Sequence, residues 1–286
     1  MIKTIEHIIP KYNQSEVDSF EDYNQFMDAS VELLKQTIEM LWFVVGISYC
    51  DEKGDSKVLN KKEAVIGGNI IRYIKLNISF LQNTCEAKIE IASILSRCIG
   101  ETYVNIKFLI ANTEERVIRN YIKNSLITEK GLWNKIKENI EKRGGDSEQI
   151  EFRMNESIKR SFDRSDFDLD EVSKSSKWQS ISKRADEVAG KEFYSIFYGL
   201  SSHSIHGNWQ DIYTYHLKNT EGGFKLKFEW NDSQPQIIEA TVLMNLDLLE
   251  LLEQTFPNQK LKAKIKELFT YQASLIKSHE NYLKNK

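Results

Sequence analysis

Two histidines close together near a predicted helix end are the residues best placed to do chemistry. The segment YSIFYGLSSHSIHGNW holds His203 and His206 three residues apart, and Gly207 follows directly. An imidazole in the last helical turn would suit a general acid working near neutral pH. The alternative interpretation is that His206 caps its own helix through a carbonyl. The spacing alone leaves both interpretations open.

The helix that carries these histidines has a small, polar face. Residues three and four apart share one side of a helix, which groups Ser195, Gly199, Ser202 and His206. Such a face suits the close approach of another helix or the presentation of a polar group. The residues expected to position or bind a substrate around His206 are Ser202, Tyr198, His203 and Asn208.

A second candidate group is Arg97 with Glu101, four residues later in an otherwise apolar stretch, SILSRCIGETYVNIKFL. A buried charge is costly unless it is paired, so one interpretation is an ion pair within the helix. In the other, Arg97 faces the polar helix and its guanidinium holds a phosphate or stabilises developing charge. Gly100, about one turn away, would permit that approach.

Several catalytic classes lack their motifs in this chain. There is no HExxH or comparable metal-ligand set, no P-loop, no GxGxxG and no kinase signature. Ser202 and His206 lack the GxSxG context of a hydrolase. We therefore expect neither a metal nor a cofactor. The aromatic residues Trp42, Phe43, Trp178 and Trp209 are interpreted as core rather than as a stacking platform.

Composition indicates a globular cytoplasmic protein. The 286 residues carry a net charge of −3, which gives no general affinity for nucleic acid or anionic lipid. Cys50, Cys85 and Cys98 are isolated, as free thiols in a reducing compartment would be. The apolar run Met40–Tyr49 is far shorter than the ~20 residues that span a bilayer, so no membrane association is expected.

Helical periodicity dominates the chain, and prolines are scarce. Thr84 is the predicted N-cap of the helix that carries Arg97. The expected helices cover residues 20–49, 61–81, 86–111, 114–164 with a break at Gly144-Gly145, 178–188, 194–206, 237–256 and 261–282. Alternation in GGFKLKFEW predicts one short β-hairpin or extended arm near 222–230. The sequence thus predicts an all-α fold, a single multi-helix bundle over 1–286, with a main bundle at 20–216 and the β excursion and closing helices at 217–286.

Three segments together resemble a bacterial family of unknown function, number 5677. They are SRCIGETYVNIKFL, KWQSISKRADEVAG and YSIFYGLSSHSIHG. The last helix is also distantly similar to helical-bundle ribonucleases of toxin and antiviral systems, in the nucleotide-binding superfamily. Those enzymes carry an Arg shortly before the catalytic His, where this chain has Gly199, Leu200 and Ser201. Arg97 would have to supply that guanidinium from its own helix.

Two functional hypotheses follow. In the first, the chain is a ribonuclease-like effector that acts on RNA, with a place in phage defence. Its catalytic residues would be His206, Arg97, Glu101, Ser202 and Tyr198, with His203 and Asn208 contacting the substrate. In the second, Arg97, Glu101, Ser202 and His206 form a buried structural network in a non-catalytic module. That module would bind a protein partner, for which the charged region Glu114–Arg164 is the expected surface. The sequence leaves oligomeric state open.

Overall fold

The computed structural model describes residues 5–172, 177–198 and 204–285. Within these residues the chain is mainly helical, with one two-stranded antiparallel sheet, and this confirms the all-α prediction. The chain forms two compact units. The first contains the chain up to Phe108 and from Ala185 onward, and the second contains Leu109–Arg184. The prediction of a single domain over 1–286 stays a prediction.

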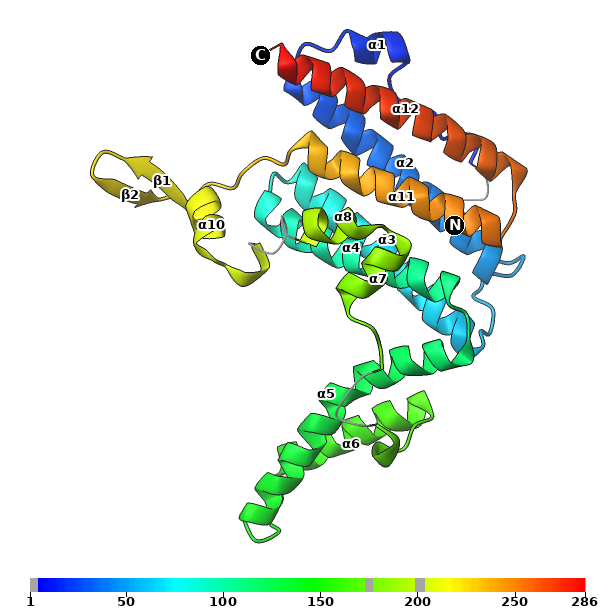
Figure 1. The fold of residues 1–286 in the computed structure, drawn as a ribbon, viewed down its shortest axis with the longest axis vertical. Helices are drawn as coiled ribbons and strands as arrows, with labels where there is room; N and C mark the ends of the chain where they lie inside the picture. Colours follow the sequence, from blue (N-terminus) through cyan, green and yellow to red (C-terminus); the bar gives the residue numbers. More distant parts are fainter. Residues whose placement is uncertain (1–4, 173–176, 199–203, 286) are drawn as a thin grey trace. The chain divides into compact units, whose positions relative to one another are not determined.

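The first unit is built on a bundle of long helices. Its elements are α1 (Gln14–Asp18), α2 (Tyr23–Tyr49), α3 (Lys61–Cys85), α4 (Ile89–Ala111), α11 (Pro235–Thr255) and α12 (Gln259–Lys284). The central helix α11 packs along both α2 and α12, as Figure 1 shows. Capping boxes at Asp22 and Asn60 fix the starts of α2 and α3. The Thr84 prediction was wrong, because α3 continues through Cys85 and the chain turns at Ala87, whose φ is +54°.

Polar side chains cross the centre of this bundle. Tyr73 and Asn245 are fully buried, and the Tyr73 hydroxyl donates to the Asn245 Oδ1 at 2.7 Å. The Asn245 amide in turn donates to the Thr37 Oγ1 at 2.9 Å. Burial raises the pKa of Tyr73 far above its ordinary value, so its hydroxyl stays protonated. The network links α2, α3 and α11 and fixes how they pack against each other.

The second unit is a helical hairpin. Its main elements are α5 (Glu115–Lys142), α6 (Gln149–Ser165) and the short 3₁₀ helix η1 (Leu169–Glu171). The predicted break falls at Gly144 and Gly145, both of which have positive φ. Its small core consists of Leu126, Trp133, Ile136, Ile158, Phe162, Phe167 and Val172. Arg119 lies over the Phe167 ring at 4.4 Å from its centroid, so some basic side chains of this unit cover its core.

Residues 191–234, here named the connecting segment, join α7 (Ile181–Val188) to α11. They contain α8 (Lys191–Phe193), the π-helix η2 (Tyr194–Tyr198), α10 (Trp209–Asp211), the π-helix η3 (Ile212–His216), β1 (Leu217–Thr220) and β2 (Gly223–Leu226). Residues 204–206 form a further helical turn. The predicted α-helix over 194–206 therefore begins as a π-helix. The predicted hairpin is present, and its first strand precedes the expected range.

Candidate functional site

One face of α4 carries the connecting segment. A Cβ built on Gly100 would overlap the ring of Phe197, so the two elements approach as closely as glycine permits. One turn further along α4, the rings of Tyr103 and Phe193 lie 5.5 Å apart. Phe193 and Phe197 stack on each other at 5.2 Å. A close approach at Gly100 is thus present as predicted, but the side chain that lies there is Phe197 and not a residue of the predicted polar face.

The beginning of α4 carries the later part of the same segment. The side chain of Tyr215 is hydrogen-bonded to Ser93, and burial raises the pKa of the Tyr215 hydroxyl. The Asn231 amide donates to the Glu90 carboxylate. Later residues of the connecting segment therefore contact earlier residues of α4. Asn231 contacts Glu90 near the start of α4, whereas Phe197 contacts Gly100 further along it. The described residues of the connecting segment that contact α4 therefore run antiparallel to it.

Arg97 lies in the middle of this face, four residues after Ser93 and three before Gly100. Only 8% of Arg97 is exposed, and its Nε donates to the Glu101 Oε1 at 3.2 Å. The predicted ion pair is thus present, with Glu101 reaching solvent at 41% side-chain exposure. A pair with one exposed partner stabilises the fold only weakly.

His206 lies at the end of the helical turn 204–206 and is exposed. Gly207 follows with a φ of +53°, a conformation that ends a helix. The Asn208 side chain accepts hydrogen bonds from the backbone N–H groups of Gln210 and Asp211 and so caps α10. The exposure of His206 leaves its imidazole accessible to a ligand.

Three other predicted site residues cannot be placed in this geometry. Ser202 and His203 lie outside the described residues, and of Tyr198 only the backbone is described. Their predicted roles, like the substrate contact of Asn208, stay predictions.

A sequence model of the family of unknown function DUF5677 matches residues 63–224, more than half of the chain. The chain belongs to this family. No curated protein and no solved structure matches it. The DUF5677 match runs from α3 into β2 and includes both the α4 face and His206. No comparison bears on the ribonuclease resemblance.

The DUF5677 region also holds an aromatic cluster that sequence reasoning missed. Trp209, Tyr213 and Phe224 contact one another, with the rings of Trp209 and Phe224 edge-on at 5.6 Å. Trp209 is 55% exposed, which corrects its interpretation as a core residue. The alternating run after Gly222 indicated a strand. What the sequence did not show was that α10 and η3 would bring two more aromatic residues to it.

His216, also in the DUF5677 region, has a carboxylate beside it. His216 Nε2 lies 3.6 Å from the buried Asp211 carboxylate, in reach for charge attraction but too far for a hydrogen bond. His206 precedes α10, whereas His216 ends η3. The two histidines therefore flank the same helical stretch, one at each end.

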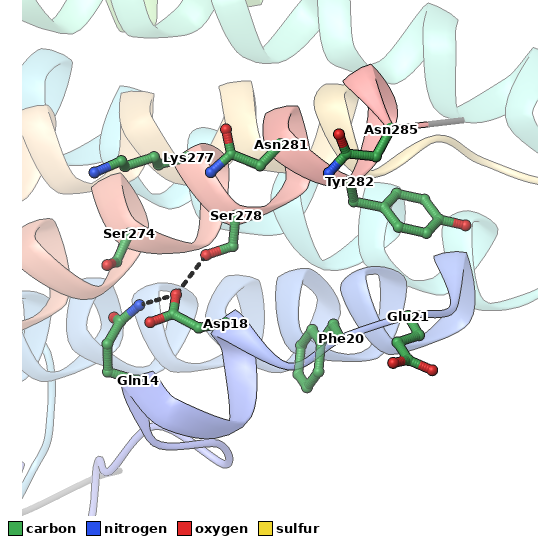
Figure 2. A pocket seen from close by; sticks show the side chains of 10 residues that line it. All are labelled: Gln14, Asp18, Phe20, Glu21, Ser274, Lys277, Ser278, Asn281, Tyr282 and Asn285. Atoms are coloured by element: carbon green, nitrogen blue, oxygen red, sulfur yellow. Dashed lines mark hydrogen bonds between the residues drawn. The ribbon is translucent and has the colours of Figure 1, made fainter.

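A polar hollow of about 720 Å³ lies at α1 and α12, outside the DUF5677 match. Figure 2 shows Asp18 facing Gln14 and Ser278, each of which donates to its carboxylate at 2.7 Å. The bond from Ser278 joins α12 to α1, whereas the bond from Gln14 lies within α1. Among the described residues, no group of three metal-ligating side chains comes together, and no helix is long and apolar enough to cross a membrane.

Proposed function

We propose that the chain is a ribonuclease-like effector that acts on RNA. The observation that carries the proposal is the placement of His206. Its imidazole is exposed at a helix end, on the segment that packs along the α4 face holding Arg97. A proton-transfer group must reach its substrate, and a guanidinium shielded from water stabilises negative charge more strongly than an exposed one. A role in phage defence rests on the resemblance and is part of the proposal.

The chemistry that fits these residues uses the RNA 2′-hydroxyl as nucleophile. The 2′ oxygen forms a bond to phosphorus while the bond from phosphorus to the 5′ oxygen breaks. Protonated His206 gives its proton to the departing 5′ oxygen, and the 2′ proton passes to water. Arg97 stabilises the charge that develops on the phosphate oxygens. The products are a 2′,3′-cyclic phosphate and a 5′-hydroxyl, and no redox step or external co-reactant is needed.

The test compares RNA cleavage by the wild type, His206→Ala and His7→Ala. The matched control, His7, is another exposed histidine, with its Nε2 3.3 Å from Glu39 in α2. Loss of a proton-transfer group typically lowers the rate by ~10²–10⁴. We expect that loss for His206→Ala alone, with all three proteins melting at the same temperature. Cleavage that is equal in His206→Ala and the wild type would overturn the proposal.

A second function, a non-catalytic module that binds protein, is favoured by the exposed cluster of Trp209, Tyr213 and Phe224. Contiguous apolar surface of this kind marks interaction sites. The two functions separate in the same assay. The second function is identified if the wild type cleaves no RNA and variants of the aromatic cluster lose binding to a protein partner.

A further inference from the structure

The β-hairpin has one apolar face and one basic face. In its register Leu217 lies opposite Leu226, and Asn219 lies opposite Phe224. These four side chains share one face of the ribbon, because neighbouring residues in a strand point to opposite sides. The intervening pair, Lys218 opposite Lys225, lies on the other face.

The apolar face continues onto the preceding helical stretch. Trp209 and Tyr213 both contact the Phe224 ring, and Asn219 donates to the Tyr213 hydroxyl at 2.7 Å. The one polar strand residue on this face therefore has its amide bonded within the cluster. Leu226 is 66% exposed, and Phe224 is 53% exposed. No part of the chain that the structure describes covers most of this surface.

We propose that this apolar face pairs with the same face of a second copy of the chain, about a two-fold axis. The Lys227 N–H donates to the His216 carbonyl at 2.9 Å, which continues the strand pairing beyond Leu226 and puts Phe228 on the same face. Five side chains therefore contribute, namely Trp209, Tyr213, Phe224, Leu226 and Phe228, the last of which is 85% exposed. With large side chains burying about 150–250 Å² each, their exposed parts amount to roughly 600 Å² per copy. Two copies would bury roughly 1,200 Å², the lower bound for a specific, stable interface.

The distribution of charge favours a second copy over RNA as the occupant. The apolar strand face carries no charged residue, so two such faces meet without like-charge repulsion. Nucleic acid would instead require cations beside the aromatic rings. Lys218 and Lys225 lie on the opposite face, and Lys218 is paired with Glu229 at 2.9 Å. The association is independent of whether the chain cleaves RNA.

Sedimentation velocity of the full chain at about 1 to 50 μM tests the pairing. A dimer with a micromolar Kd would dissociate on dilution within this range. We expect the wild type to be a dimer. Phe224→Asp should raise the dimer Kd at least about 30-fold, the usual effect of losing a central anchor. The matched control is Lys225→Glu, on the opposite face of the same strand, which should remain dimeric.

A cross-linking measurement covers the case in which Phe224→Asp fails to fold. In a Cys85→Ser background, which removes the exposed thiol, Leu226→Cys should form a disulfide-linked dimer under mild oxidation. Lys225→Cys, one residue away, should not. The proposal is overturned if the wild type sediments as a monomer at every concentration. That result overturns it whether or not single-stranded RNA binds the monomer. Equal cross-linking at the two positions also overturns it.

Discussion

The bundle and the connecting segment use the same kinds of residue in opposite ways. In the bundle, Tyr73 and Phe80 are completely buried. In the connecting segment, Trp209 and Phe224 are each more than half exposed. Burial of an aromatic side chain is a main source of folding stability, whereas exposed aromatic surface gains its energy only when something binds. The comparison assigns stability to the bundle and contact to the connecting segment.

Matched phenylalanine truncations should give the largest difference between the two regions. Phe80→Ala empties a fully buried site and should cost about 3–5 kcal/mol of unfolding free energy. Phe224→Ala removes a half-exposed ring and should cost less than about 1 kcal/mol in the monomer. Urea unfolding at low protein concentration measures both. Equal losses would mean that the aromatic cluster is part of the stabilising core.

A buried histidine and carboxylate in the bundle provide a second test. His279 Nδ1 lies 3.1 Å from Glu239 Oε1, and both residues are buried. His279→Ala leaves a buried carboxylate without this partner and should cost about 3 kcal/mol. His216→Ala removes a half-exposed imidazole that lies too far from the Asp211 carboxylate for a hydrogen bond, and should cost less than about 1 kcal/mol. A smaller loss at His279 than at His216 would contradict the assignment.

Glu239 also makes the bundle sensitive to pH. Burial raises the pKa of its carboxyl, and His279 partly opposes that shift. An acid whose pKa is raised by folding contributes its full stability at pH values below its unfolded-state pKa. That contribution is lost as pH rises through its folded-state pKa. Glu239→Gln cannot ionise, so its stability relative to the wild type should increase as pH rises above 4.5, the ordinary pKa of this carboxyl. Melting curves across that range measure the difference, and a constant difference would refute this cause.

Two glycines of the bundle give the smallest effects, with opposite signs. Gly100→Ala forces a methyl group into the Phe197 ring and should destabilise by about 1–3 kcal/mol. Gly68, inside α3, has open space where a Cβ would lie. Gly68→Ala should therefore stabilise by about 0.5–1 kcal/mol through helix propensity. Thermal melts compare the two, and a stable Gly100→Ala would show that α4 and the connecting segment are not tightly packed.

Local patterns predicted the helices well and the connecting segment less well. The break at Gly144-Gly145 follows from glycines at positive φ, which local sequence reveals. The Thr84 cap failed because packing carried α3 past a residue type that favours helix starts. The aromatic cluster depends on how α10, η3 and β2 meet, and such long-range contacts are not encoded in any single periodicity. Of the candidate site, the sequence found the pair of Arg97 with Glu101 and the helix end at His206.

The central claim is that the connecting segment carries the function, with His206 transferring a proton to cleaved RNA. The most direct measurement is single-turnover cleavage of an RNA oligonucleotide and of the same oligonucleotide with one 2′-deoxy residue at the cleaved position. The wild type should leave a 2′,3′-cyclic phosphate on the RNA and spare the deoxy position. His206→Gln should be slower by at least about 100-fold at an unchanged melting temperature. Cleavage at the deoxy position, or equal rates for His206→Gln and the wild type, would contradict the claim.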